Sequence, residues 1–436
     1  MSDVALGEYA FAERRRRMRA FEGLAGRLVR GMTLGGIALF FLVSPMLLFN
    51  WGFSYEDVGG SVLEKVHPGS WVVLMALVMK AFASGRPLSL VNEFARPPAL
   101  AMYLAAWAFL IVFTILRKAP FTPLIDTFML PAMLFVLAGG MADDEKKRAA
   151  LLIHLLLNIN ALLGLYEYLS GYRLTPYVAG TLLIEADWRS TALLGHPLAN
   201  AMMTGSYILT VGIGGARDLP RLLRPAIIGL QFMGMIAFGG RSALVLTLLL
   251  LSFVGMWSFV KFLRGARTDL LQAGLILLVM PAVVTLLVAA INGGFFDQMI
   301  ERFVNDNGSA KARVIMLKLF NYVSWEDLVF GPDQALITSL QHTEGIEYGI
   351  ESFWVAFILI NGLAMSFIFF PALGAFSLLL VTRTGARTSI LLIYFYLLAS
   401  TSVSMSAKTC AFGMFVIMIL TMLRPEAAPR RIGSRA

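Results

Sequence analysis

The sequence is poor in cysteine, histidine and charged side chains. Of its 436 residues, one is cysteine (Cys410), four are histidine, and 14% are Asp, Glu, Lys or Arg. A single cysteine excludes an internal disulfide framework and a thiolate metal site. No His and carboxylate residues stand at the spacings of metal ligands, so we expect a protein that works without a metal and without another cofactor.

Sequence motifs for nucleotides and for symmetric transporters are also missing. No glycine-rich phosphate-binding loop precedes a predicted helix, which argues against a nucleotide sugar as substrate. The sequence has no internal repeat and no inverted pair of hydrophobic runs interrupted by Gly or Pro, which many secondary transporters contain. These absences argue against enzymes that use nucleotide sugars and against transporters built from repeats.

Long hydrophobic runs are what the sequence has in abundance. Hydrophobic residues make up 58% of the chain, and the mean hydropathy is +0.75. A helix needs about 20 mainly apolar residues to cross the ~30 Å hydrocarbon core of a membrane. The runs are continuous rather than alternating, which favours helices over a barrel. We therefore predict an all-α, polytopic integral membrane protein with about twelve transmembrane helices and one large external loop. The expected spans are residues 31–49, 70–85, 99–116, 121–140, 149–168, 195–215, 225–240, 242–261, 270–291, 351–380, 389–404 and 409–423.

These spans divide the chain into six expected segments. Two spans (70–85 and 225–240) are short, and one (351–380) is long enough to be bent at Pro371. The segments are a basic amphipathic N-terminal stretch (1–30), the N-terminal helices (31–148), the central helices with Arg189 and Arg241 (149–291), the large external loop (292–350), the C-terminal helices (351–423) and a basic tail (424–436).

The distribution of Lys and Arg predicts the orientation in the membrane. These residues concentrate in alternate loops, beginning with the arginine run at 14–17. Because positive loops stay cytoplasmic, we expect both termini inside and residues 292–350 outside. The net charge of +9 is then a topology signal that also attracts anionic lipid. Its spread over all the inside segments argues against nucleic-acid binding. Residues 48–51 offer no small-residue cleavage site, so we expect the first run to remain as a span.

Amphipathic patterns predict further helices beside the spans. Hydrophobic residues in segment 11–28 fall near one helical face beside the arginine run, which predicts a short helix on the inner membrane surface. In the external loop, hydrophobic residues of 294–305 recur at helical spacing, which predicts a helix along the outer leaflet. Ser309 can cap a second helix, and Gly331-Pro332 marks a turn.

A few arginines are expected on the outer side, where the positive-inside bias makes them scarce. They include Arg189, Arg241, Arg302 and Arg313. Arg241 follows two glycines and has apolar helix on both sides. A central Arg costs roughly 2.5–3.5 kcal/mol on insertion scales, and such residues usually face a cavity or an anionic partner. Together the guanidinium groups suit phosphate oxygens. Contact with lipid head groups is the alternative, above all for Arg302 and Arg313 taken alone.

One carboxylate and two histidines are candidates for a general base. Glu351 stands where the external loop re-enters the membrane, and His342 and His196 are the reserves. Simpler roles compete with this one. Glu351 can cap the N-terminus of the next helix, where a negative charge is favourable. His196 can begin a helix together with Pro197, because Pro suits the first helical turn.

Four short motifs, in this order along the chain, resemble a known superfamily. They are WRSTALLGHP (188–197), GRSA (240–243), the long loop with Arg313, Trp325 and Gly331, and GIESFW (349–354). Over roughly residues 150–370 the chain is similar to the O-antigen ligase and O-antigen (Wzy-like) polymerase superfamily, and most similar to its VpsF-like exopolysaccharide biosynthesis members. The resemblance implies a helical protein of the bacterial inner membrane with a large periplasmic loop. It also implies glycan transfer from an undecaprenyl-diphosphate-linked donor on the outer face.

Departures from the superfamily pattern favour a repeat-unit polymerase over a ligase. Leu198 stands where the first motif usually has Asn directly after Pro197, and Gly239-Gly240 precede Arg241 where Ser-x-Ser is frequent. Ligases tend to have a His at the place of Glu351-Ser352.

The resemblance implies a reaction and a set of partners. Arg189 and Arg241 would clamp the leaving diphosphate, with Arg302 and Arg313 as further members, and Glu351 would deprotonate the acceptor hydroxyl. The expected partners are the undecaprenyl-diphosphate-linked oligosaccharide, membrane lipids, and a chain-length regulator with other polysaccharide assembly proteins. Three alternatives stay open: ligase-type transfer to a lipid acceptor, a transporter of polysaccharide or lipid-linked glycan, and a structural membrane subunit.

Overall fold

A computed structural model describes most of the chain and is helical nearly throughout. It leaves out residues 1–2, 56–59, 84–87, 180–181, 185–186, 266–284, 286–287, 289–290, 305–308, 347–348, 403–404 and 425–436, and of residues 3–22 it describes the backbone alone. Within the described residues the exception is a hairpin, in which β1 (Val178–Ala179) pairs antiparallel with β2 (Leu182–Leu183). The predicted all-α class is confirmed. The helices are α1 (Asp3–Leu42), α2 (Pro45–Asn50), α3 (Pro68–Ala83), α4 (Leu88–Ala95), α5 (Pro98–Leu116), α6 (Thr122–Leu124), the π-helical η1 (Ile125–Met129), α7 (Leu130–Gly139), α8 (Asp143–Ser170), α9 (Pro197–Thr210), the π-helical η2 (Val211–Gly215), α10 (Leu223–Phe238), α11 (Arg241–Leu263), α13 (Asp297–Val304), α14 (Ser309–Lys318), the 3₁₀-helical η3 (Leu319–Tyr322), α15 (Trp325–Phe330), α16 (Gln334–Glu344), α17 (Phe353–Thr384), α18 (Thr388–Ala399) and α19 (Ala411–Met422).

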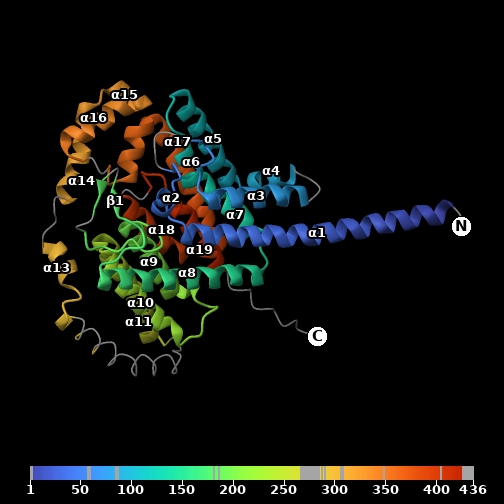
Figure 1. Ribbon diagram of the computed structural model, residues 1–436, viewed down its shortest axis with the longest axis horizontal. Helices are drawn as coiled ribbons and strands as arrows, with labels where there is room; N and C mark the ends of the chain where they lie inside the picture. The colour runs from blue at the N-terminus through green and yellow to red at the C-terminus, as the bar shows by residue number, and fades with distance from the viewer. Residues whose placement is uncertain are drawn as a thin grey trace.

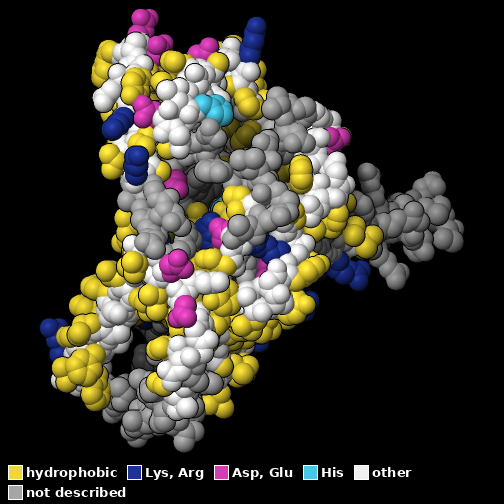
Figure 2. Space-filling view, turned by 60° about the vertical axis from the view of Figure 1, so that its left-hand side comes forward, with side chains coloured by type: hydrophobic (Ala, Val, Ile, Leu, Met, Phe, Trp, Pro, Cys, Tyr) yellow, Lys and Arg dark blue, Asp and Glu magenta, His cyan; other side chains and the backbone are white. Residues whose placement is uncertain are grey.

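Six helical segments in the described part of the chain are long and apolar enough to cross a membrane. They are Gly23–Leu42 of α1, α5, the continuous segment Thr122–Gly139, α8, α11 and α17. On α11 the side chains of Leu249, Phe253 and Met256 are at least 60% exposed, as expected of side chains that face lipid. Hydrophobic side chains cover much of the face in Figure 2, and basic and acidic side chains gather near its middle and at its top. By length and composition, the chain is a helical membrane protein.

The predicted spans correspond closely to helices. Within the described residues, eleven of the twelve expected ranges contain a helix, and the range 270–291 lies mostly outside them. Several of these helices are shorter than a full crossing, such as α18 and α19 with 12 residues each. The predicted total of twelve crossings therefore stays a prediction.

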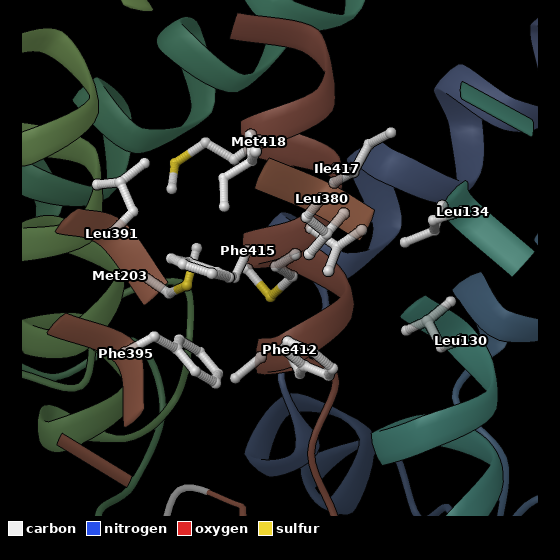
Figure 3. Close-up of a cluster of buried hydrophobic side chains, with 14 of the residues drawn as sticks. Leu130, Leu134, Met203, Leu380, Leu391, Phe395, Phe412, Phe415, Ile417 and Met418 are labelled. Atoms are coloured by element: carbon white, nitrogen blue, oxygen red, sulfur yellow. The ribbon is translucent and has the colours of Figure 1, made fainter. Parts of the chain in front are cut away.

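α19 forms the centre of the hydrophobic core (Figure 3). All of its residues except Leu420 are buried, as expected of a helix that is apolar on every side. Phe415 stacks on Phe395 of α18 with 4.4 Å between the ring centres. α7 approaches closely at Gly413, where a Cβ atom would lie 2.6 Å from Cδ2 of Leu130. The last predicted span thus holds the neighbouring helices together.

The N-terminal segment and the first span form one helix. α1 is 40 residues long and passes through the predicted boundary at residue 30 without a break, and it extends away from the remaining helices in Figure 1. It ends at Leu42, not at residue 49 as predicted. The reason is local: Ser44 is the N-cap of α2, with Oγ accepting from the backbone N–H of Leu47 at 3.2 Å, and Pro45 begins that helix.

α17 is interrupted at Gly362, a position that sequence analysis did not single out, and Pro371 lies further along inside the helix. Gly362 has φ = +83°, outside the helical region. A Cβ atom at this position would lie 2.4 Å from the backbone N of Gly331 and 2.5 Å from the carbonyl oxygen of Val329. The turn after α15 therefore lies directly against α17, and only glycine allows both the close approach and the positive φ.

Arg117 fastens this turn to α17. The residue follows the last turn of α5, and its guanidinium donates to the carbonyl oxygens of Ile360 (2.7 Å), Gly331 (3.0 Å) and Pro332. Burial lowers the pKa of Arg117, and the nearby Asp333 carboxylate works in the opposite direction. One cation thus connects three segments that are far apart in sequence.

The external loop folds into short helices. The helix predicted for residues 294–305 is confirmed as α13, and α14 begins at Ser309 as predicted. In Figure 1, α14, α15 and α16 lie together at one corner of the molecule. They bury a small separate core, in which Leu319 and Ile337 pack together with Leu359 of α17. On α13, Phe303 and Val304 remain exposed, so the predicted contact of this helix with the outer leaflet stays a prediction.

Candidate functional site

The loop that contains Arg189 is held in place by a buried carboxylate of α8. Glu167 is 2% exposed and accepts the backbone N–H groups of Leu174 (2.9 Å), Thr191 (2.9 Å) and Ala192 (2.8 Å). Ala192 has φ = +39°, which residues other than glycine adopt rarely. Because a buried carboxylate that lost these donors would be left unsatisfied, the loop has little freedom to move.

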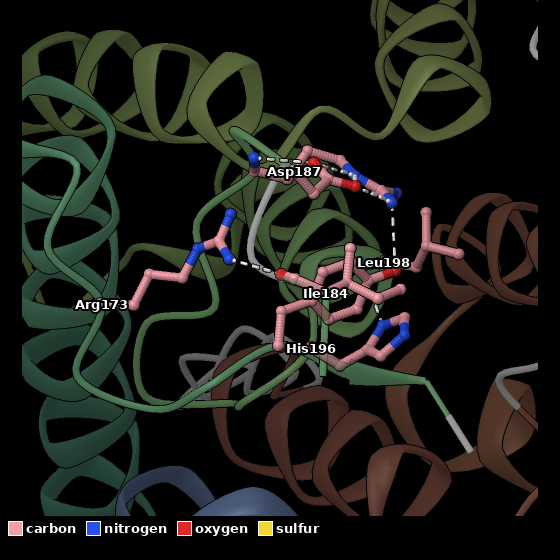
Figure 4. A network of polar contacts seen from close by, with 7 residues as sticks. Arg173, Ile184, Asp187, His196 and Leu198 are labelled. Atoms are coloured by element: carbon pink, nitrogen blue, oxygen red, sulfur yellow. Dashed lines mark hydrogen bonds and ion pairs between the residues drawn. The ribbon is translucent and has the colours of Figure 1, made fainter. Parts of the chain in front are cut away.

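Arg189 makes a two-pronged ion pair inside this loop (Figure 4). Its Nε lies 3.0 and 2.9 Å from the two carboxylate oxygens of Asp187, and its Nη2 lies 2.5 Å from Oδ2. Nη2 also donates to the Tyr177 hydroxyl at 3.0 Å, and the guanidinium lies over the Tyr177 ring. Burial acts to lower the pKa of Arg189, but the Asp187 carboxylate and Tyr177 outweigh it and raise the pKa. The guanidinium is therefore fixed, buried and permanently charged.

Two glycines pack the segment before Arg241 against Arg189 and against α9. Gly239 ends α10 with φ = +65°, and a Cβ atom there would lie 2.7 Å from Cγ and 2.8 Å from Cδ of Arg189. A Cβ atom at Gly240 would lie 2.3 Å from Cβ of Ala201 on α9. Arg241, which is partly buried, is the first residue of α11. Two motifs that were singled out separately in the sequence are thus packed against each other.

His196 begins α9. Its Nδ1 accepts the backbone N–H of Leu198 at 3.1 Å, and its ring packs edge-on against Tyr177 at 5.4 Å between centres (Figure 4). This hydrogen bond assigns the proton of the neutral ring to Nε2. The helix-starting role that competed with the base role is therefore present, because Nδ1 is already used as a cap.

Glu351 and Arg313 form an ion pair. Nε of Arg313, on α14, lies 3.5 Å from Oε2 of Glu351, and the two side chains are 36% and 29% exposed. The N-cap position of α17 belongs to Ser352, so Glu351 stands one residue before the cap. The structure thus brings together two predicted site residues that were assigned different roles.

The other two predicted residues lie on separate helices. His342 is exposed in the last turn of α16, where a basic side chain faces the negative end of the helix dipole. Arg302 belongs to α13, and its side chain is outside the described residues.

A second polar cluster was largely missed by sequence reasoning. Asp126, in the π-helical η1, is fully buried and accepts from the Tyr55 hydroxyl (2.9 Å), the Ser70 hydroxyl (2.6 Å) and the backbone N–H of His67 (3.1 Å). Lys408 donates to the Tyr55 carbonyl oxygen at 2.6 Å, with its Nζ 3.6 Å from the centre of the Tyr55 ring. One feature of the sequence could have revealed Lys408: it is a cation between two apolar spans on the predicted outer side.

The Arg189–Arg241 region has the chemistry of an anion site. The guanidinium groups come from a loop and from the first residue of α11, where the helix N-terminus adds a partial positive charge. Within the described residues, Nη1 of Arg189 has no hydrogen-bond partner of its own, so it can still donate. In the same part of the chain, no three His, Cys, Asp or Glu side chains are grouped as metal ligands. The candidate chemistry of this region is therefore binding of a phosphate-like anion.

Comparison of the chain with protein-family models, with curated proteins and with solved structures found no match.

Proposed function

We propose that this protein transfers glycan repeat units from an undecaprenyl-diphosphate-linked donor, as a polymerase on the periplasmic face of a bacterial inner membrane. In this proposal the chain crosses the membrane twelve times, both termini are cytoplasmic, and residues 292–350 are periplasmic. The positive-inside distribution of Lys and Arg supports this orientation.

The observation that most supports the proposal is the packing of Arg189 on Gly239, two residues before Arg241. It makes one cationic region out of two motifs that the superfamily resemblance had linked by sequence order alone. Burying arginines at the end of apolar helices is unfavourable unless they have anionic partners. Asp187 accepts hydrogen bonds from only some of the N–H groups of Arg189. A diphosphate would supply further acceptors for both guanidinium groups.

The proposed reaction needs a charge clamp and a base. The acceptor hydroxyl oxygen forms a bond to the anomeric carbon of the donor sugar, and the bond from that carbon to the diphosphate oxygen breaks. The diphosphate leaves with the electron pair, and the cations of Arg189 and Arg241 stabilise its growing negative charge. Glu351 takes the hydroxyl proton. Arg313, 3.5 Å from Glu351, orients this carboxylate and is a further contact for the diphosphate.

A ligase would run the same reaction with a lipid acceptor. The presence of Glu351-Ser352 in place of a histidine favours the polymerase. Analysis of product length decides between them, because a polymerase makes a ladder of repeat units and a ligase transfers one finished glycan.

The buried cluster around Asp126 favours a second candidate function, a transporter of lipid-linked glycan. Ionisable residues inside a membrane often mark transport pathways, and Asp126 lies in a π-helical turn opposite a stretch between α18 and α19 that is not a regular helix. Against it, all described partners of Asp126 are ordinary hydrogen-bond donors of the same chain. Asp126→Asn separates the two functions. If the protein is a transporter, the substitution should abolish translocation of the lipid-linked donor. If it is a polymerase, the substitution should lower the stability of the protein and leave translocation of the donor unchanged.

Substitutions at the two ends of α11 test the proposal. Arg241 and Arg264 stand at opposite ends of this helix, and either can reach lipid phosphate. With purified protein in nanodiscs and a radiolabelled lipid-linked donor, we expect Arg241→Ala and Arg241→Lys to abolish donor binding and polymer, since Lys lacks the bidentate fork. Arg264→Lys should retain both. Normal polymer from Arg241→Lys would mean that Arg241 merely reaches lipid head groups, and the clamp would be rejected.

A further inference from the structure

Buried polar atoms that lack a hydrogen-bond partner are concentrated on three neighbouring helices. Among the described residues, all but one of the fully buried side-chain atoms of this kind belong to α8, to α9, to α10 or to the loop between α8 and α9. They include atoms of His154 and Asn160 on α8, of Asn200 and Thr204 on α9, and of Gln231 on α10. An unpaired buried donor or acceptor costs about 1–3 kcal/mol, and buried water is the usual partner of such groups.

His154 and Gln231 belong to one hydrogen-bonded network between these helices. Nδ1 of His154 lies 2.6 Å from the hydroxyl of Tyr207 on α9. Asn158, one turn after His154, donates from Nδ2 to the same hydroxyl (3.4 Å), and its Oδ1 accepts from Nε2 of Gln231 (3.2 Å). His154, Tyr207 and Gln231 are at most 2% exposed. Within the described part of the chain, the network ends at two unpartnered atoms, Nε2 of His154 and Oε1 of Gln231.

Tight packing closes this network on the side of the external loop. A Cβ atom at Gly234 of α10 would lie 3.1 Å from Cβ of Ala161 on α8, and one at Gly164 of α8 would lie 2.4 Å from Cε1 of Phe238 on α10. α8 and α10, which lie side by side in Figure 1, are too close together there to admit water. Water therefore has to reach the network from the side where α8 begins, which is the cytoplasmic side in the proposed topology.

A second buried histidine shows the pattern of a purely structural role. His67 is 1% exposed, its Nε2 lies 2.7 Å from the carbonyl oxygen of Val43, and its Nδ1 accepts the backbone N–H of Gly69 at 3.0 Å. Both of its ring nitrogens are thus occupied by the backbone. His154 is equally buried, but one of its ring nitrogens is left for a partner that lies outside the described residues.

We infer that His154 is a proton-binding site reached by water, in a network with Tyr207, Asn158 and Gln231 that opens toward the start of α8. A hydronium ion gives its proton to the ring nitrogen that has the lone pair, and a water molecule is left. The protonated ring has two N–H donors. One can donate to the Tyr207 hydroxyl, which accepts as well as donates, and the other to water.

The surroundings of His154 suit a proton site. The charged group that acts on the ring is the carboxylate of Asp218, which is itself paired with Arg424 near the start of α8. Ionisable side chains inside a membrane often belong to proton pathways. The site is apart from the Arg189–Arg241 region, so the inference goes beyond the glycan-transfer proposal and does not depend on it.

Hydrogen exchange at the histidine rings of the purified full-length protein tests the inference. In D₂O the C2 hydrogen of a histidine exchanges through the protonated ring, from which hydroxide removes it, so exchange requires both a bound proton and water. The chain has four histidines, and mass spectrometry of peptides resolves them. We expect His154 to exchange at least about tenfold faster than His67, which needs local opening of the structure to do so. Exposed His342 gives the upper limit. Equal rates at His154 and His67 would overturn the inference without any substitution.

Two variants make the test specific. Gln231→Leu removes the unpartnered acceptor at similar volume, so it should dry the network and slow exchange at His154 by about tenfold. Ser206→Ala is the matched control, because Ser206 is the buried neighbour of Tyr207 and its hydroxyl donates within α9 to Met202 (2.9 Å). It should leave the exchange unchanged. Unchanged or faster exchange in Gln231→Leu would mean that His154 exchanges by opening of the helices, and the site would be rejected. Because neither donor nor acceptor is present, failure here would leave glycan transfer untouched.

Discussion

The Nε atom of Arg313 lies 3.5 Å from Oε2 of Glu351, and this ion pair joins the external helices to the start of α17. Partly exposed pairs of this kind contribute at most about 1 kcal/mol to stability, so the pair has little weight in holding the fold. Its consequence is positional: a carboxylate next to Ser352, the N-cap of α17, is held beside a cation on a different segment. A substrate anion that bound Arg313 would approach the same carboxylate.

Glu351→Gln should separate turnover from binding. A general base is needed for proton transfer but not for holding the donor, so we expect unpolymerised lipid-linked units to accumulate while donor binding is retained. Glu326→Gln, in the exposed first turn of α15, is the matched control and should leave polymer unchanged. Polymer length, donor binding and melting temperature are measured on both variants. Since the N-cap is Ser352, the melting temperature should change little. Full activity of Glu351→Gln would move the base role to His342.

Gly239→Ala should displace Arg189. The new methyl group would lie under 3 Å from Arg189 and Trp188, in addition to the strain of φ = +65°. Gly171→Ala is the control, because Gly171 also has a positive φ (+72°) but nothing lies within 4 Å of its Cβ position. We expect the control to lose about 1 kcal/mol of stability and Gly239→Ala to lose about 1–3 kcal/mol more, together with donor binding. Equal melting temperatures for the two variants would mean that the Arg189 contact is unimportant.

The sequence predicted the helical class and most helix positions because hydrophobic runs depend on local composition. α5 and α11 lie within a residue or two of the expected 99–116 and 242–261. Arg241 was singled out for the same kind of reason, since an arginine between apolar runs is visible without any knowledge of the fold.

Contacts between distant segments could not be predicted in this way. The break of α17 at Gly362 arises from the approach of Gly331, whereas the local rule for proline singled out only Pro371. The Arg313–Glu351 pair depends on how α14 packs. Lys408 gains its place in a cavity from η1 and α5, which lie almost 300 residues earlier in the chain.

Glu167→Gln should loosen the loop that contains Arg189. The carboxylate accepts three backbone N–H groups, and an amide would turn a donor toward at least one of them. We expect a loss of about 1–3 kcal/mol, a lower melting temperature and faster trypsin cleavage after Arg173 or Arg189. Asp144→Asn, at an exposed position of the same helix, is the control and should behave like the unmodified protein. Unchanged cleavage in Glu167→Gln would show that other contacts hold the loop.

The sidedness of the external helices decides whether any of these residues can meet a periplasmic substrate. Thr338 on α16 and Ala386 between α17 and α18 are both exposed, and the proposed topology puts them on opposite sides of the membrane. With Cys410 replaced by Ser, Thr338→Cys should react with a membrane-impermeant maleimide in intact cells after the outer membrane is opened. Ala386→Cys should react only after the inner membrane is permeabilised. We expect this pattern because Lys and Arg concentrate in the loops assigned to the inside, and loops rich in Lys and Arg stay in the cytoplasm during membrane insertion. Labelling in the reverse order would put Arg313 and Glu351 in the cytoplasm, and glycan transfer on the outer face would have to be abandoned.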